Sequence, residues 1–131
     1  MNFPNWLRVF GDKSYRGQCP TETAEQATFF NNLPPHLKKV ALHIKNEGRR
    51  SAMQMAKQKA AGGFIKGASD CIIPGSPTLV IEMKRKDHTQ STWQPGQQQY
   101  LEACQDLGCC ACVALGWEAA MEAVRAWENK C

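Results

Sequence analysis

The chain has 131 residues, of which 43% are hydrophobic, and it carries a formal net charge of +4. This length suits one domain, and the apolar fraction predicts a folded core rather than a disordered segment. No apolar run approaches the roughly 18 residues of a membrane-spanning helix, and the N-terminus lacks the basic and apolar regions of a secretory leader, so we expect a cytoplasmic protein with no membrane partner.

Residues 1–20 mix aromatic side chains with Pro, Gly and basic residues and sustain neither a strand nor a helix period. We expect an N-terminal extension with one helical turn around Trp6–Phe10, followed by a domain that spans residues 21–131. The pattern does not decide whether this extension packs on the domain, joins a dimer interface or touches DNA.

The first helix is expected to start at Thr21. A threonine can cap a helix, and Glu22 and Glu25 occupy the first turn, where the helix dipole favours acids. These two acids are three residues apart and share a face, so either could serve a site at that end of the helix. Pro34-Pro35 ends the helix.

Strands and helices alternate from residue 40 onward. A strand is expected at Val40–Ile44, and a helix at residues 51–61 that ends at Gly62-Gly63. Two short apolar runs, residues 71–73 and 79–84, flank a turn rich in Pro and Gly and predict a β-hairpin.

The C-terminal third predicts a polar loop at residues 87–93, a helix at 95–107, a strand at 109–115 and a helix at 118–127. The strand is nearly continuously apolar, which is typical of burial on both faces. The order α-β-α-β-β-α-β-α predicts an α/β domain, in which helices flank a mixed β-sheet.

Four of the seven cysteines lie in the segment that reads as core; they are Cys104, Cys109, Cys110 and Cys112. An odd number of cysteines, placed among apolar residues, favours reduced thiols over a disulfide framework. The Cys-x-x-Cys spacing at Cys109 and Cys112 also leaves open a zinc or redox protein, although a zinc site would need a second ligand pair and a turn.

The chemistry of the chain is concentrated in the hairpin. Side chains two apart on a strand share a face, so Glu82 and Lys84 point the same way and Met83 points to the other side. Antiparallel pairing brings Asp70, just before the first strand, close to Glu82. Two carboxylates beside an ammonium suit a Mg²⁺ site that hydrolyses a phosphate ester, although Glu82 and Lys84 could also form a simple exposed ion pair.

Charge is segregated along the chain. Residues 38–86 contain eleven Lys and Arg but only three acids, and two of those acids are the proposed metal ligands Asp70 and Glu82. A basic surface around a small acidic pocket suits a polyanion cut at a metal site, whereas the alternative is an ordinary solvated charged face.

The pattern resembles the PD-(D/E)xK nuclease superfamily, and most closely its virus-type replication-repair nuclease (VRR-NUC) branch. The matching segments are residues 66–70 (Lys-Gly-Ala-Ser-Asp), 82–85 (Glu-Met-Lys-Arg) and 97–101 (Gln-Gln-Gln-Tyr-Leu), together with Gly108 before the last strand. Ser69 stands where the family usually has Pro. The resemblance extends from about Thr21 to about Val124 and implies a restriction-endonuclease-like fold.

This resemblance implies Mg²⁺, with Mn²⁺ as a substitute, held by Asp70, Glu82 and the backbone carbonyl of Met83. Lys84 would orient water or stabilise charge, and Gln97 would contact the metal-site water or the scissile phosphate, unless it is one more solvated residue of a Gln-rich turn. Either Glu22 or Glu25 would supply the acid that the family carries on its first helix. No organic cofactor is implied.

Small members of the family are mostly viral or bacterial. The resemblance therefore implies a homodimeric endonuclease that resolves four-way, Holliday-type DNA junctions in bacterial or phage replication or repair. Eight side chains are candidates for contacts with the DNA backbone: His43, Lys45, Asn46, Arg49, Arg50, Lys66, Arg85 and Lys86. Alternatives are a flap or single-strand nuclease of the same fold, or a non-catalytic nucleic-acid-binding module.

Overall fold

The computed structural model describes residues 1–44, 52–63 and 65–129, and its centre is a five-stranded sheet in the order β1-β5-β4-β3-β2. The strands are β1 (Arg8–Phe10), β2 (Leu42–His43), β3 (Cys71–Ile73), β4 (Leu79–Lys84) and β5 (Cys110–Leu115). The helices are α1 (Glu22–Asn32), α2 (Pro35–Lys38), α3 (Ala52–Ala61), α4 (Gln97–Asp106) and α5 (Trp117–Glu128), with a 3₁₀ turn η1 (His88–Gln90). The predicted mixed sheet with flanking helices is confirmed.

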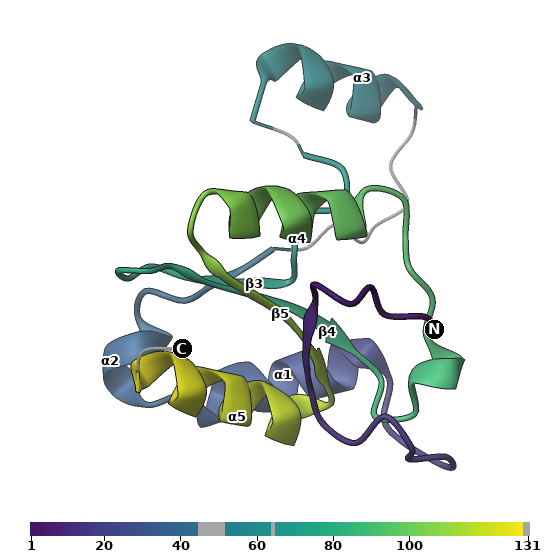
Figure 1. Ribbon diagram of the computed structural model, residues 1–131. Helices are drawn as coiled ribbons and strands as arrows, with labels where there is room; N and C mark the ends of the chain where they lie inside the picture. The colour runs from purple at the N-terminus through teal and green to yellow at the C-terminus, as the bar shows by residue number, and fades with distance from the viewer. Residues whose placement is uncertain (45–51, 64, 130–131) are drawn as a thin grey trace.

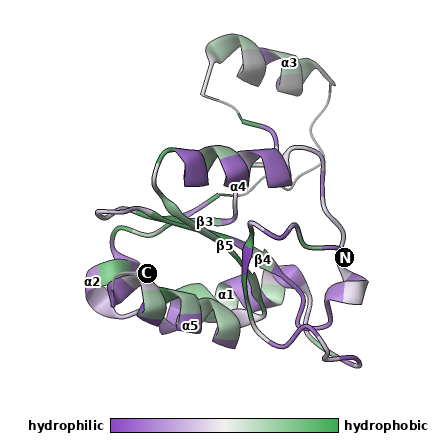
Figure 2. Cartoon of the chain, viewed as in Figure 1, coloured by the Kyte–Doolittle hydropathy of each residue, from purple (hydrophilic) through white to green (hydrophobic). Residues whose placement is uncertain are grey.

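Helices cover both faces of the sheet (Figure 1). On one face α1 and α5 pack over a core that includes Phe29 and Ile81, and on the other α4 packs over a core that includes Val80 and Leu101. The central strands are strongly hydrophobic and α4 carries many hydrophilic residues (Figure 2), as expected for a layered domain with one buried sheet. The third helix, α3, stands apart from these layers (Figure 1).

The predicted hairpin is confirmed, because β3 and β4 pair antiparallel with Cys71 opposite Ile81. All six residues of β4 are buried; Ile81 lies in the core under α1 and α5, whereas Val80 lies in the core under α4. Met83 belongs to the core under α1 and α5, whereas Glu82 and Lys84 line a pocket together. The prediction that these two charged side chains share a face is therefore confirmed.

Residues 8–10 form a strand that pairs parallel with β5, so the helical turn expected around Trp6–Phe10 is wrong. The N-terminal segment thus supplies an edge of the sheet, while the domain boundary drawn at residue 20 stays a prediction. The four-residue helix α2 was also not expected. Pro34 follows the C-cap of α1 at Leu33, and Pro35 opens α2, because proline fits the first helical position, where no backbone N–H is needed.

The cysteine-rich segment is strand β5, and Cys112 is 3% exposed and packs in the core. Among the cysteines that the structure describes, five are free thiols, and Cys110 is disulfide-bonded, which the sequence analysis did not expect. No helix in the described ranges is long and apolar enough to cross a membrane.

Candidate active site

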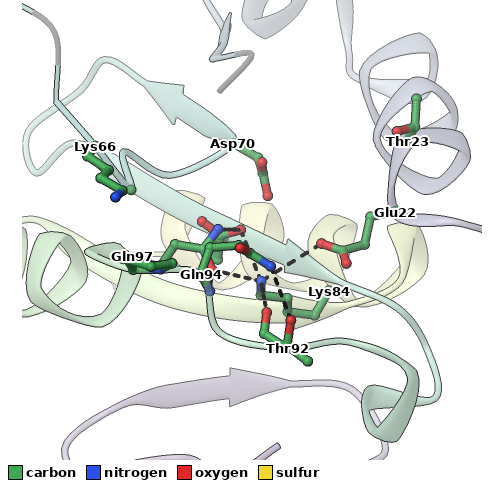
Figure 3. A pocket seen from close by; sticks show the side chains of 11 residues that line it. Glu22, Thr23, Lys66, Asp70, Lys84, Thr92, Gln94 and Gln97 are labelled. Carbon is green, nitrogen blue, oxygen red and sulfur yellow. Dashed lines mark hydrogen bonds and ion pairs between the residues drawn. The ribbon is translucent and has the colours of Figure 1, made fainter. Parts of the chain in front are cut away.

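A cavity of about 530 Å³ opens beside the last residues of β4 (Figure 3). It is lined by side chains from α1, from the loop before β3, from β4 and from the segment that leads into α4. These residues are Glu22, Thr23, Lys66, Gly67, Asp70, Glu82, Lys84, Thr92, Gln94, Pro95 and Gln97. The structure therefore brings together five of the six side chains that the sequence analysis singled out for chemistry.

Asp70 and Glu82 both line this cavity, and their carboxyl groups interact. The backbone N–H of Met83 donates a hydrogen bond to Asp70 Oδ2 at 2.8 Å, which ties the Asp70 carboxylate to the strand that carries Glu82. Glu82 is only 1% exposed, and its Oε1 has no hydrogen-bond partner in the described part of the chain. A buried carboxylate oxygen without a partner is costly, so this atom is a feature that requires an explanation.

Burial raises the pKa of the Glu82 carboxyl well above its usual range. The neighbouring Asp70 carboxylate raises this pKa further, Lys84 lowers it, and Glu22 adds a smaller increase. Two carboxyl groups in one desolvated site resist joint ionisation, and a bound cation relieves that cost.

Lys84 is as deeply buried as Glu82, at 1% exposure, and its ammonium is held from several sides. Nζ donates to the carbonyl oxygen of Thr92 and to Oε1 of Gln97, both at 2.8 Å. It also lies 3.9 Å from a carboxylate oxygen of Glu22 and 3.9 Å from one of Glu82. The ammonium is thus fixed in one place by the interactions that Figure 3 draws as dashed lines.

Gln97 links the two charged groups of β4. Its Oε1 accepts from Lys84 Nζ and from the backbone N–H of Gln94 at 2.9 Å, so its Nε2 is left to donate to Glu82 Oε2 at 3.3 Å. This hydrogen-bond pattern fixes the orientation of the amide. Gln97 is therefore part of the polar cluster and not merely a solvated residue of the first turn of α4.

The structure separates the two acids of the first helix. Glu22 lies in the cavity, where Ser91 Oγ donates to its Oε2 at 3.2 Å and Lys84 lies near its other oxygen. Glu25 is buried elsewhere, and its carboxylate accepts a hydrogen bond from the backbone N–H of Trp117 at the start of α5. Acids at a helix N-terminus commonly serve this structural purpose.

Two glycines bring the Asp70 loop against the start of α4. Gly67 and Gly96 both have left-handed backbone angles, with φ of +86° and +90°. A Cβ on Gly67 would lie 2.3 Å from the carbonyl carbon of Gly96, and a Cβ on Gly96 would lie 2.5 Å from the oxygen of Lys66. Only glycine permits this close approach, which sets the loop that carries Asp70 beside the helix that carries Gln97.

Part of the Mg²⁺ donor set implied by the family resemblance fits the residues present. The donors are two carboxylates, one of which has a buried oxygen without a partner among the described residues, and hard divalent cations prefer such oxygen ligands. The described ranges hold no cluster of three or more His, Cys, Asp or Glu side chains suited to a metal. The family resemblance implies the backbone carbonyl of Met83 as a further ligand.

The basic residues expected at DNA are in different situations. Lys66 lines the cavity, and His43 stacks on Phe30 at 4.6 Å between ring centroids, with Nε2 hydrogen-bonded to Gln26. Arg85 donates to the carbonyl oxygens of residues 19 and 20, and Lys86 lies over the Tyr15 ring at 4.6 Å. The remaining candidates, Lys45, Asn46, Arg49 and Arg50, lie outside the described residues.

Sequence reasoning missed Thr23, Thr92, Gln94 and Pro95 in the cavity wall. Thr92 matters most, because its backbone carbonyl accepts from Lys84. A backbone acceptor in a polar loop has no signature in the side-chain pattern. The Pro95-Gly96 pair is the one local signal that could have indicated a tight turn at this site.

One solved structure, described as a VRR_NUC domain protein, has the same fold with a TM-score of 0.68. The two sequences are 24% identical, and the likeness covers 88% of this chain and 92% of the other. No family model matches the chain, and no curated protein matches it. The likeness confirms the fold that the sequence resemblance implied.

Proposed function

We propose that this chain is a metal-dependent DNA endonuclease that hydrolyses phosphodiester bonds in the cavity at the end of β4. The observation that carries the proposal is the buried Glu82 carboxylate, which has an unpartnered oxygen within the described structure and lies beside a second carboxylate. A site that concentrates negative charge at such a cost is suited to a divalent cation. The shared fold with a VRR_NUC domain protein supports the same conclusion.

Asp70, Glu82 and the carbonyl of Met83 would hold the metal, with Mg²⁺ as the natural ion and Mn²⁺ as a substitute. A bound Mg²⁺ supplies Lewis-acid polarisation of the phosphoryl group and lowers the pKa of bound water. Asp70 reaches the site because the Met83 N–H fixes its carboxylate. This arrangement explains why two acids are retained in a segment that is otherwise strongly basic.

Lys84 is the residue that we assign to charge stabilisation at the scissile phosphate or to orientation of the attacking water. Its ammonium is buried and held by Thr92 and Gln97, so little reorganisation is needed during the reaction. Gln97 is hydrogen-bonded to both Lys84 and Glu82 and so fixes the position of one side chain relative to the other. Glu22 is the helix acid of the site, since it lies 3.9 Å from Lys84, whereas Glu25 supports α5.

The substrate that we propose is branched DNA, with four-way junctions as the preferred form. The basic segment of residues 38–86 suits contact with a phosphate backbone, and Lys66 lies in the cavity wall where a phosphate would enter. A homodimer would place two such cavities on the two strands of a junction, since a two-fold axis repeats the site.

The test is cleavage of labelled four-way junction, flap, single-stranded and duplex DNA with Mg²⁺ or Mn²⁺. Wild type is compared with Glu82→Ala and with Glu102→Gln, which removes an exposed charge from α4 and serves as the matched control. Paired symmetric nicks in the junction, lost only in Glu82→Ala, are the expected result. Cleavage confined to flaps or single strands would keep the chemistry and overturn the junction preference.

Absence of any cleavage by the wild type, with DNA binding retained, would instead favour a non-catalytic nucleic-acid-binding module. That alternative explains the basic segment but gives no reason for Asp70, Glu82 and Lys84 to share one cavity. Gel filtration gives the oligomeric state independently, and a monomer at micromolar concentration would contradict the proposed dimer.

A further inference from the structure

The segment that follows β4, residues 85–93, passes directly along the buried Lys84. Thr92 accepts a hydrogen bond from Lys84 Nζ at 2.8 Å, and the ring of Trp93 lies under the same ammonium, 5.6 Å from its centroid. An ammonium over an indole face is attracted by the ring quadrupole, more strongly where water is excluded. The position of Lys84 therefore depends on the position of residues 92 and 93.

Residues 1–20 hold this segment along its length. Hydrogen bonds join the two segments at four residues of the second one. Arg85 donates to the carbonyls of Cys19 and Pro20, and Asp87 accepts from the Gly17 N–H. His88 donates to the carbonyl of Lys13, and Gln90 donates to the carbonyl of Gly17. These contacts link residues 65 to 75 positions apart in the sequence. Hydrogen bonds between two loops at so many points make one rigid unit of them.

Trp93 is the point at which the N-terminal residues reach the ammonium of Lys84. Its Nε1–H donates to the carbonyl of Asn2 at 2.8 Å, and Phe3 packs edge-on against it with centroids 6.3 Å apart. One edge of the indole is thus anchored by Asn2 while its face meets Lys84. Trp93 does not line the cavity, so it is not placed to touch substrate there.

We infer that Trp93 is a positioning residue for Lys84, and that the N-terminal segment acts on the site by holding the Trp93 ring in place. The inference rests on the proposed nuclease function for its kinetic consequence. Its structural content, that the indole ring and residues 2–3 set the environment of the Lys84 ammonium, is independent of any activity.

The kinetic test compares Trp93→Leu and Trp93→Phe with matched changes at Trp127. Trp127 also donates from Nε1 to a backbone carbonyl, that of Pro77 at 2.7 Å, and it is also half-buried, but it lies on α5 and not at the cavity. Trp93→Leu should lower kcat roughly tenfold with KM changed less than about twofold, because a misplaced group costs rate rather than binding. Trp93→Phe keeps a ring and should lose less.

Trp127→Leu and Trp127→Phe should leave kcat within about twofold of wild type at temperatures where circular dichroism shows each variant folded. Equal losses of kcat in the Trp93 and Trp127 variants would show that Trp93 contributes only to general stability, and this would overturn the inference. A loss confined to KM would do the same, since it would assign Trp93 to DNA binding.

The second readout needs no activity. It is the NMR spectrum of protein labelled with ¹³C at the lysine ε-carbons, in which the Lys84 signal is identified as the one that disappears in Lys84→Met. The ring current of Trp93 should give this signal a chemical shift different from those of the exposed lysines. Trp93→Leu should return it toward them, Phe3→Ala should shift it part of the way, and Trp127→Leu should leave it unchanged. An unchanged chemical shift of Lys84 in Trp93→Leu would overturn the inference. A changed shift in a protein that cuts no DNA would overturn only the proposed nuclease function.

Discussion

Two carboxylates five residues apart, Glu82 and Asp87, belong to residues that expose little surface, 1% and 4%, and yet their surroundings are opposite. Asp87 accepts hydrogen bonds from the backbone N–H groups of Gly17 and Thr89, from the Thr89 hydroxyl and from the Gln90 amide. Glu82 has a second carboxylate beside it, and its Oε1 lacks a partner in the described part of the chain.

The pKa values of the two acids shift in opposite directions, as their surroundings require. The hydrogen bond from the Thr89 side chain, followed by that from Gly17, lowers the pKa of Asp87, whereas burial and Asp70 raise the pKa of Glu82. A buried acid that the protein satisfies is part of the structure. A buried acid that the protein leaves unsatisfied, in a cavity, is a candidate for a ligand. This comparison separates the acid that we propose to be functional from the structural one by their surroundings alone.

The largest expected effect concerns activity. Asp70→Asn and Glu82→Ala should each lower the rate of DNA cleavage at least about a thousandfold, because each removes a proposed metal ligand. Asp87→Asn, measured at a temperature where it is folded, should lose far less of the rate, because it removes no metal ligand and weakens only some of the hydrogen bonds that hold the segment of residues 85–93. Quantified nicking of a labelled junction gives these rates, and comparable losses in all three variants would remove the distinction between the two acids.

The next effect concerns stability. Without metal, Glu82→Gln should raise the free energy of unfolding at pH 7 by about 1–3 kcal/mol, because it removes a carboxyl group whose ionisation is opposed by burial and by Asp70. Mg²⁺ should stabilise the wild type and leave this variant unchanged. Urea unfolding with and without Mg²⁺ measures both quantities. A Glu82→Gln variant that is less stable than the metal-free wild type would assign Glu82 to structure.

Asp87 should make the fold sensitive to acid. Its pKa is lower in the folded state than in the unfolded chain, so its contribution to stability is present above the ordinary pKa near 4 and is lost as the pH falls through the folded-state value. Asp87→Asn should therefore unfold at a lower temperature than wild type at pH 7, and the difference should shrink toward pH 2. Thermal melts across this range test the sign, and a constant difference would contradict it.

The smallest effect is expected at Ser69, a neutral polar group that is fully buried and whose hydroxyl has no partner within the described ranges. Ser69→Ala should raise the free energy of unfolding by about 1 kcal/mol, because a desolvated hydroxyl is removed. The cleavage rate should not change. A drop in the cleavage rate with unchanged stability would show that the Ser69 hydroxyl takes part in the site. The unpartnered polar atoms that serve the site would then include Ser69 as well as Glu82.

Local patterns were enough to predict the hairpin and the common face of Glu82 and Lys84. Strand period, turn residues and the Thr21 cap are properties of neighbours in sequence, and Thr21 Oγ1 indeed accepts from the Ala24 N–H. Four candidate site residues lie together for the same reason, since the hairpin region and the helix that follows it carry all of them: Asp70, Glu82, Lys84 and Gln97.

What sequence could not supply depends on contacts between distant segments. Strand β1 has three residues and exists through its pairing with β5, which no local period reveals. Glu22 and Glu25 share a helix face, and only the packing of α5 against α1 assigns Glu25 to Trp117. Arg85 looks like a phosphate ligand in sequence, but it is hydrogen-bonded to the N-terminal segment.

The most direct test of the account is a calorimetric titration of the protein with Mn²⁺ at pH 7.5, on wild type, Glu82→Gln and Asp87→Asn. The account predicts saturable binding to the wild type and to Asp87→Asn, and loss of that binding in Glu82→Gln. Equal binding by Glu82→Gln, or no binding by the wild type, would contradict the claim that the unsatisfied carboxylate of β4 is a metal ligand.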